Sequence, residues 1–394
     1  MDVKPFEKRV LLSSATMHGE EQKYVKEAFD TNWVTTVGEN INQLENGIKN
    51  LLGMEGTVAM SSGTCAGHFA VKLAGVKQGD VVFAQSLTFD ATVNPVTYEK
   101  GKLVFIDSEK DTWNMDPKAL EKAFEKYPEC KTVITVNLYG TPSKLDEIKA
   151  ICDKHNATLI EDAAESLGAS INGKMTGTFG KYNIVSFNGN KIITTSGGGM
   201  LVTDNLEDAK RARKWATQAR DNAPWYQHSE LGYNYRMSNI VAGIGRGQLL
   251  HLQEHIDRKR HIYEKYKEGF KGLPVKMNPY LENSNPIFWL SCLIIDKDAL
   301  CKHSRTDFEY EYVHEVGKTC PDEIRDKLEA INVETRPIWK PMHLQPLYKD
   351  NDFIKLEEDV AADIFDRGLC LPSDIKMTDE EQDIIIKVIR SCFE

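Results

Sequence analysis

Short runs of apolar and β-branched residues recur along the first half of the chain, with helical periodicity between them. Because these runs are continuous and do not alternate with polar residues, they are typical of strands buried on both faces of a mostly parallel sheet. Helical patterns over residues 117–126 and 144–155 separate them, so the order predicts an α/β fold with right-handed crossovers. Seven strands are predicted: Thr57–Met60, Val81–Ala84, Lys102–Asp107, Thr132–Asn137, Thr158–Asp162, Asn183–Phe187 and Gly199–Thr203.

The pattern changes beyond about residue 240. The elements predicted there are one long amphipathic helix, one extended segment and two shorter helices: Asn239–Leu273, Ile287–Ile295, Pro321–Ala330 and Asp352–Asp366. A chain of 394 residues is also too long for one small core. We therefore expect a large domain over residues 1–250 and a smaller C-terminal α+β domain over residues 251–394, joined by the long helix.

Composition and charge exclude several classes of protein. The net charge is −10 and the longest basic run is Arg258–Arg260, which argues against a nucleic-acid-binding surface. The first ten residues lack the apolar core of a signal peptide, and no apolar run approaches membrane-spanning length. Eight cysteines are scattered without a C-x-x-C pair, which is typical of free thiols in a reducing cytoplasm. We expect a cytoplasmic protein without disulfide bonds or a metal site.

The first candidate for chemistry is Met60–Thr64, which follows a predicted strand and opens the helical stretch AGHFAVKLAGV. In an open parallel sheet, ligands bind at the carboxyl ends of the strands. The N–H groups at a helix start, with serine and threonine hydroxyls beside them, suit a phosphate. A plain N-cap is the alternative interpretation. Neither G-x-x-x-x-G-K-[ST] nor G-x-G-x-x-G is present, which argues against nucleoside triphosphates and dinucleotides.

The second candidate is Asp162, which ends the run ATLIED and is preceded by Glu161. The strand pattern places Asp162 at the carboxyl edge of the sheet. A carboxylate in such a largely buried place needs a cationic or hydrogen-bonding partner. The alternative is an aspartate that caps the following helix.

The third candidate is Lys191, in the segment SFNGNKIITTSGGGM. No other charged residue occurs between Lys181 and Asp204, whereas most lysines lie on solvated faces. A phosphate site, a buried carboxylate and an isolated amine are the groups that a pyridoxal-phosphate site requires. Gly197–Gly199 would let the backbone pack closely behind the lysine loop. The three candidates together therefore predict pyridoxal phosphate as the cofactor.

Eight segments in order along the chain carry a resemblance to a known family: NWVTTVGENINQLE (32–45), SSGTCAGHFA (61–70), LTFDATVNPV (87–96), NLYGTP (137–142), IEDAAESLGA (160–169), SFNGNKIITTSGGGM (186–200), LGYNYRMSNI (231–240) and TRPIWKPMHLQP (335–346). Together they resemble the DegT family of pyridoxal-phosphate sugar-nucleotide aminotransferases. The resemblance implies the aspartate-aminotransferase-like (type I) fold.

The resemblance also implies roles at the cofactor. Lys191 is expected to bond covalently to it, and Asp162 to pair with its pyridine nitrogen. Phe89 is expected to stack on the ring, and Glu165 to lie near the phenolic oxygen. Core packing is the alternative for Phe89. The residues expected at the phosphate are Gly63, Thr64 and Ser186, with Asn234 reaching it from the neighbouring subunit of a homodimer. For Asn234 the alternative is a plain turn residue.

The same resemblance points to the substrates, with L-glutamate as the amino donor. Asn188 stands where many members carry histidine, and this form resembles the PglE-like subgroup of bacillosamine synthesis. That subgroup aminates C4 of UDP-linked 4-keto-6-deoxy-N-acetylhexosamines. The residues expected to contact the substrate are Trp33, Asn188, Arg336 and His343.

Three other functions stay open on the sequence alone. One is a C3- or GDP-sugar aminotransferase of the same family. Another is a sugar dehydratase of this fold, although such dehydratases lack the lysine that is present here as Lys191. The last is a non-catalytic regulator that binds pyridoxal phosphate without turnover. The amino-acid sequence does not determine the sugar, the nucleotide or the carbon that is aminated.

Overall fold

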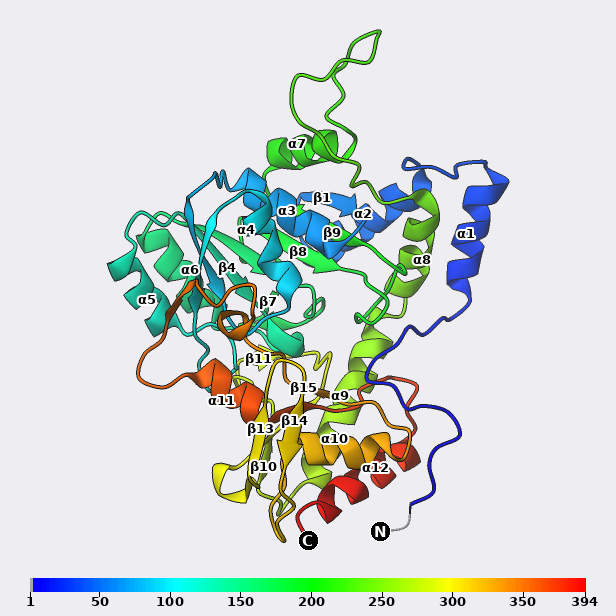
Figure 1. Cartoon of the computed structure of the whole chain (residues 1–394). Coiled ribbons are helices and arrows are strands. Elements are labelled where there is room, and N and C mark those ends of the chain that lie inside the picture. Colours follow the sequence, from blue (N-terminus) through cyan, green and yellow to red (C-terminus); the bar gives the residue numbers. More distant parts are fainter. Residues whose placement is uncertain (1–2) are drawn as a thin grey trace.

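The computed structural model describes residues 3–394, so the first two residues of the N-terminal stretch lie outside it. Its largest element is an eight-stranded sheet with the order β1-β9-β8-β5-β4-β2-β3-β16 (Figure 1). The strands are β1 Gly56–Met60, β2 Val81–Gln85, β3 Lys102–Ile106, β4 Thr132–Val136, β5 Thr158–Asp162, β8 Tyr182–Ser186, β9 Gly199–Thr203 and β16 Asp352–Ile354. All seven predicted strands are present, each within one residue of its predicted ends. The sheet is parallel except for β9, which runs antiparallel to both β1 and β8.

The eighth strand, β16, corrects two predictions: the sheet has eight strands instead of seven, and residues 352–366 do not form one helix. Residues 352–366 were expected to form a helix, but Asp352–Ile354 pairs parallel with β3 at the sheet edge. Helix α11 begins only at Val360 and ends at Arg367, with Asp359 as its N-cap. A three-residue edge strand is too short to show a periodicity of its own, and the helical pattern after it extended the prediction backwards.

Helices cover both faces of the central sheet because residues that alternate along each strand are buried on opposite sides. On one face lie α3 Gly63–Leu73, α4 Asn94–Tyr98 and α7 Leu206–Ala216, packed over side chains such as Val82 and Ala84. On the other face lie α5 Pro117–Lys126 and α6 Leu145–Lys154, packed over neighbours such as Phe83. Helix α2, Glu39–Leu52, covers the part of that second face formed by β1, β8 and β9. The central sheet is therefore the middle of three layers.

The predicted helix Asn239–Leu273 is wrong as a single element. The chain forms α8, Asn239–Leu249, and α9, Leu252–Gly269, with a break between them. Glycines of α8 lie against α1, Glu20–Asp30: a Cβ on Gly247 would stand 2.6 Å from the Glu21 nitrogen. The apolar periodicity continues through the break, so the periodicity alone does not show that the helix ends at Leu249. Helix α9 is the longest helix at 18 residues, yet none of the helices in residues 3–394 has both the length and the apolar character of a membrane span.

A second sheet lies in the C-terminal part, with the order β10-β12-β17-β15. Its strands are β10 Val275–Met277, β12 Cys292–Ile295, β17 Gly368–Cys370 and β15 Arg336–Pro337. Helices α9, α10 Pro321–Glu329 and α12 Asp379–Ser391 pack against it. The expected extended segment 287–295 is a strand only from Cys292, because Phe288 takes a φ of 48° and stacks on Tyr263. Smaller strands are β6 Ser170–Ile171, β7 Lys174–Met175, β11 Ser284–Asn285, β13 His303–Arg305 and β14 Tyr310–Tyr312.

The two ends of the chain meet in this C-terminal part (Figure 1). Val10 bridges to Val333 and is buried in the same apolar cluster as α10 and α12. The domain boundary expected at 250/251 falls at the break between α8 and α9. The division into residues 1–250 and 251–394 itself stays a prediction.

Candidate active site

A cavity of 310 Å³ opens at the carboxyl ends of β5 and β8. Its volume lies within the range of about 300–1,000 Å³ that is usual for small-molecule sites. The structure brings eight of the predicted site residues to its wall: Gly63, Thr64, Phe89, Asp162, Glu165, Ser186, Asn188 and Lys191. The cavity therefore gathers the three candidate segments that the sequence placed at this edge of the sheet.

The start of α3 forms one side of the cavity. Ser62 is its N-cap and accepts a hydrogen bond from the Cys65 nitrogen at 3.1 Å, so the N-cap interpretation is correct for this serine. The first N–H groups of a helix have no partner within the helix, and those of α3 begin beside the cavity. A Cβ on Gly63 would come within 3.0 Å of the Ser186 Cβ, so the helix start and the end of β8 nearly touch. The arrangement suits an anion held between hydroxyls and backbone N–H groups.

The glycines after the lysine loop contribute unequally. A Cβ on Gly199 would lie 2.4 Å from the Gly63 nitrogen, and one on Gly198 would lie 2.2 Å from the Thr195 Oγ1. Both positions thus require glycine for close packing. A Cβ on Gly197 would meet no atom within 4 Å, which corrects the expectation that all three glycines are needed for packing.

Asp162 ends β5 with its carboxylate buried at the base of the cavity. It accepts hydrogen bonds from the Thr92 Oγ1 at 2.7 Å and from the Ala164 nitrogen at 3.0 Å. Residues 164–168 form turns, so Asp162 does not cap a following helix. Burial raises the pKa of Asp162, and the two hydrogen bonds and the charge of Lys191 oppose this effect only in part. A cationic group in the cavity would favour the ionised form of this carboxyl.

The Lys191 amine lies between a carboxylate and an aromatic face. Its Nζ is 3.4 Å from the Glu165 Oε1 and 4.2 Å from the centre of the Trp289 ring. Glu165 also accepts a hydrogen bond from the Tyr139 nitrogen at 2.7 Å. Burial raises the pKa of Glu165 to about 7, although the nearby Lys191 charge acts in the opposite direction. Glu165 can therefore exchange a proton near neutral pH.

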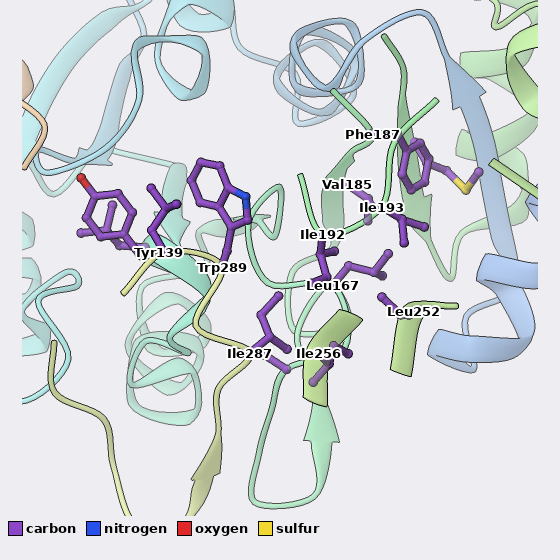
Figure 2. Close-up of a cluster of buried hydrophobic side chains, with 14 of the residues drawn as sticks. Tyr139, Leu167, Val185, Phe187, Ile192, Ile193, Leu252, Ile256, Ile287 and Trp289 are labelled. Carbon is purple, nitrogen blue, oxygen red and sulfur yellow. The ribbon is translucent and has the colours of Figure 1, made fainter. Parts of the chain in front are cut away.

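Buried groups hold Trp289 and the loop that carries Lys191 in place. Trp289 belongs to the apolar cluster drawn in Figure 2, with Ile192, Ile287 and others around it. Its Nε1 donates to the Asn190 carbonyl at 2.6 Å. The buried Lys259 donates to the Trp289 carbonyl at 2.9 Å, and burial lowers the pKa of this lysine to about 7. The lysine loop is thus fixed by contacts from the C-terminal part of the chain.

The mouth of the cavity is aromatic. The Phe89 side chain is 54% exposed, which excludes plain core packing. Its ring lies 5.4 Å from that of Trp339, and both rings line the cavity. The sequence alone did not single out Thr92, Asn190, Trp289 or Trp339. Trp339 stands in the recognised segment 335–346, but Trp289 has no local sequence signal.

Two predicted residues lie away from this cavity within the single chain. Asn234 is exposed and bridges to Thr217, in the segment that extends away from the body after α7 (Figure 1). Trp33 is 52% exposed just after α1, and its carbonyl accepts a hydrogen bond from Asn239. Neither lines the cavity.

The two remaining predicted residues belong to the C-terminal part. Arg336 is exposed, pairs with Glu334 at 2.9 Å and lines an adjoining cavity of 520 Å³. His343 is held by the Ser86 Oγ at 2.7 Å and by Asp359 at 3.1 Å, and it lines neither cavity. His343 thus links the loop that carries Phe89 to the start of α11.

A three-layer fold with a lysine, a buried carboxylate and a helix start on one cavity has the groups that a pyridoxal-phosphate site requires. Comparison with known proteins agrees: residues 15–390 match the DegT/DnrJ/EryC1/StrS aminotransferase family. The chain belongs to this family. Its members use pyridoxal phosphate, so the protein is a pyridoxal-phosphate-dependent aminotransferase.

Individual relatives align over nearly the whole chain. The Bacillus subtilis putative pyridoxal phosphate-dependent aminotransferase EpsN is 44% identical over 98% of this chain and 96% of its own length. A GDP-perosamine synthase of Caulobacter vibrioides is 32% identical over 97% of each chain. Among solved structures, a DegT/DnrJ/EryC1/StrS aminotransferase from Brucella abortus superposes with a TM-score of 0.83 at 25% identity, over 95% of both chains. These matches confirm the expected fold.

Glu165 gives the cofactor-free protein a pH-dependent stability. Its pKa is raised from 4.5 to about 7 on folding, so the folded state binds more protons than the unfolded state between these values. Its contribution is complete below about pH 4.5 and is lost as the pH rises through about 7. Glu165→Gln should remove about 3 kcal/mol of this pH dependence. Urea unfolding of both proteins at about pH 5 and about pH 8 measures it; equal pH dependence in the two proteins would contradict the assignment.

Proposed function

We propose that the protein moves the amino group of L-glutamate to the 4-keto carbon of a nucleotide-linked 4-keto-6-deoxy sugar, with a UDP-linked 2-acetamido-2,6-dideoxy-4-ketohexose as the substrate. The observation that carries the proposal is the position of the Lys191 amine, on the same cavity as Asp162 and the start of α3. Family membership supports the reaction type. The form SFNGNK, with Asn188 where many members of the family carry histidine, supports the UDP-linked substrate.

The residues around the cavity fit pyridoxal phosphate. When bound, the cofactor supplies an electron sink for a carbanion at the carbon that carries the amino group. Asp162 would hold a proton on the pyridine nitrogen, because its buried carboxylate lacks a cationic partner at hydrogen-bond distance among the described residues. Gly63, Thr64 and Ser186 would bind the phosphate, and the exposed ring of Phe89 would stack on the pyridine ring.

Lys191 would act twice. Its amine would bond to the cofactor at rest and, once freed, would be the general base that takes the proton from the glutamate Cα. Glu165 would share protons with this amine across 3.4 Å. Trp289 packs over the amine and limits the access of water to it. The side chains named for these steps all line the cavity.

The adjoining cavity would accept the sugar nucleotide. It shares Phe89, Asn190, Trp289 and Trp339 with the first cavity, so a ligand could extend from one into the other. Arg336 and Lys340 line it and would bind the diphosphate by turning away from the carboxylates of Glu334 and Asp307, with which they now pair. Asn188 lines the first cavity on its exposed side, where the sugar ring would lie. Trp33 and His343 remain predicted substrate contacts that these cavities do not include.

Product analysis tests the proposed function. The holoenzyme is incubated with L-glutamate and a panel of UDP-, GDP- and TDP-linked 4-keto and 3-keto sugars, and the products are identified by NMR. Amination at C4 of the UDP-linked N-acetyl sugar is expected. Faster turnover of a GDP-linked or a 3-keto substrate would favour the alternative aminotransferases, and GDP-perosamine synthase is the name of one relative. A cofactor absorption band that ignores every amino donor would instead indicate a non-catalytic regulator.

We further propose a homodimer in which Asn234 of each chain completes the phosphate site of the other. The extended segment between α7 and α8 supports this, because it exposes Trp225, Tyr226 and Leu231 by 66%, 81% and 70%. A two-fold dimer would cover both segments and form two equivalent sites.

Mixing two inactive variants tests the shared site. Lys191→Ala removes the amine, and Asn234→Asp places a negative charge that repels the phosphate. In a mixed dimer with shared sites, one site carries both lesions and the other neither, so activity should reappear on subunit exchange. A mixture that stays inactive, although a tagged pull-down confirms exchange, would show that Asn234 does not act across the interface.

A further inference from the structure

A cluster of three histidines and two glutamates lies where the N-terminal segment meets the α8–α9 break. We name it the His18 cluster, and its members are His18, Glu20, His251, Glu254 and His255. The last three come from the sequence HLQEH, whose spacing places them on one side of the first turns of α9. His18 lies in the irregular segment before α1. The cluster thus joins parts of the chain more than 200 residues apart.

The polar atoms of the His18 cluster face one another. The Nε2 atoms of His18 and His255 are 2.7 Å apart. The ligating atoms of His18, His251 and Glu254 all lie within 4.8 Å of one another. His251 places its Nδ1 3.0 Å from Glu254 and its Nε2 3.2 Å from Glu20. Such convergence of imidazole nitrogens and a carboxylate is the arrangement of a metal site.

The buried His255 is oriented as a metal ligand. Its Nδ1 lies 2.7 Å from the Ile192 carbonyl, which can only accept, so the Nδ1 carries the proton. The Nε2 of neutral His255 therefore presents a lone pair toward His18. Ligating histidines regularly donate their other ring N–H to a carbonyl or a carboxylate, which fixes the tautomer. The contact of His251 with Glu20 would serve the same purpose.

Charge and donor type select the ion. With neutral imidazoles, the His18 cluster carries the two negative charges of Glu20 and Glu254, which a divalent cation would balance. Imidazole nitrogens suit zinc and its first-row neighbours, whereas calcium and magnesium take oxygen ligands. Three imidazoles and a carboxylate match the four-coordinate geometry of zinc.

We propose that the His18 cluster is a structural site for a divalent transition metal of the Zn²⁺ type. Its ligands are His18, His251 and Glu254, whose ligating atoms already lie within 4.8 Å of one another, and His255, whose Nε2 now contacts only His18 and must move closer to the other two. Four protein ligands leave no open position for a substrate, which is typical of a structural site. Ligand nitrogens at zinc stand about 3.3 Å apart, given Zn–N bonds of about 2.0–2.1 Å. The Nε2 atoms of His18 and His255, now 2.7 Å apart, must therefore separate by about 0.6 Å. The His18 and His251 rings, now stacked with centres 3.7 Å apart, must turn out of parallel so that both planes contain the ion.

Metal binding would fasten the N-terminal segment to the start of α9. Gln248 also connects the N-terminal segment to this region, because it donates a hydrogen bond to the Thr16 carbonyl at 2.7 Å. Through the Ile192 carbonyl the site also contacts the residue that follows Lys191. The sequence did not predict this metal site. The scattered cysteines do not form it, and its histidines are separated by the 232 residues between His18 and His251.

Metal content and affinity test the proposal on the full-length holoenzyme. The protein is stripped with a chelator, loaded with Zn²⁺, freed of excess metal by gel filtration and assayed by mass spectrometry and titration calorimetry. We expect about one zinc per chain, and binding at least about 100-fold weaker in His251→Gln and His255→Gln. The control is His261→Gln, an exposed histidine of the same helix that pairs with Asp379 at 2.9 Å and lies outside the His18 cluster. It should bind zinc within about twofold of the parent.

A measurement on the unmodified chain keeps the test decisive if a variant fails to fold. Loading with Co²⁺ should give the intense visible bands of a four-coordinate nitrogen and oxygen site, without a thiolate charge-transfer band. No retained metal, a thiolate band, or full zinc affinity in His255→Gln would overturn the proposal. In that case the contact between the His18 and His255 nitrogens is a hydrogen bond, and no metal ion is bound there.

Discussion

Lys191→Ala should fold and bind pyridoxal phosphate but lose turnover by at least about 10³-fold. The groups proposed to hold the phosphate and the ring come from other residues and survive the change. The amine proposed to bond to the cofactor and to act as general base is lost, and general-base catalysis alone is worth about 10²–10⁴-fold. The variant also leaves Glu165 without its partner at 3.4 Å, so the pKa of this carboxyl should rise further.

The measurement combines the absorption spectrum of the bound cofactor with turnover in the presence of L-glutamate and the keto sugar. Lys181→Ala is a matched control, because Lys181 is exposed and lies outside the cavity. It should be as active as the parent. If Lys191→Ala retained a rate within about tenfold of the parent, Lys191 would lose both of its proposed roles.

Asp162→Asn should be the next most damaging substitution. Its amide keeps the size of the carboxylate and can accept from Thr92, but it carries no charge to hold a proton on the pyridine nitrogen. Breaking one side of a buried ion pair costs about 3–5 kcal/mol, which corresponds to a loss of about 10²–10³-fold or more. We expect this loss in the first half-reaction, measured as the rate at which the cofactor band bleaches on adding L-glutamate.

Thr92→Val separates the charge of Asp162 from its positioning. The valine removes one hydrogen bond to the carboxylate and leaves its charge in place. Such a bond is worth about 1–3 kcal/mol, so the rate should fall less than in Asp162→Asn. A near-normal bleaching rate in Asp162→Asn would remove the aspartate from its proposed role.

The sequence predicted the central sheet well because of where the strands lie. Strands such as β4 and β9 are buried along their whole length, so continuous apolar runs mark both of their ends. Two helix predictions failed, the single helix over residues 239–273 and the helix over residues 352–366. Both depend on contacts between residues that are distant in the sequence. The break after Leu249 ends a helix whose glycines pack on α1, and β16 exists because it pairs with β3. Neither contact has a trace in the local periodicity.

The same distinction applies to the cavity. Asp162 ends β5 and Lys191 lies in the loop that follows β8, so the topology alone brings them to one edge of the sheet. Trp289, by contrast, reaches the lysine from an irregular segment of the C-terminal part, held by Lys259 and Asn190. A tryptophan in such a segment looks like any other core residue until the fold is known. Long-range placement, more than chemistry, therefore limited what the sequence could show.

The pairing of β16 with β3 determines how the chain could be divided. Although the α8–α9 break is a natural place to cut, a fragment ending at residue 250 would lack β16 and expose β3 as a bare sheet edge. The remaining fragment would lack Val10, which fills the core beside α10 and α12. Exposed edges invite pairing with other chains. A nick at this junction should therefore leave two pieces that stay interlocked, and expression of either half alone should yield aggregates.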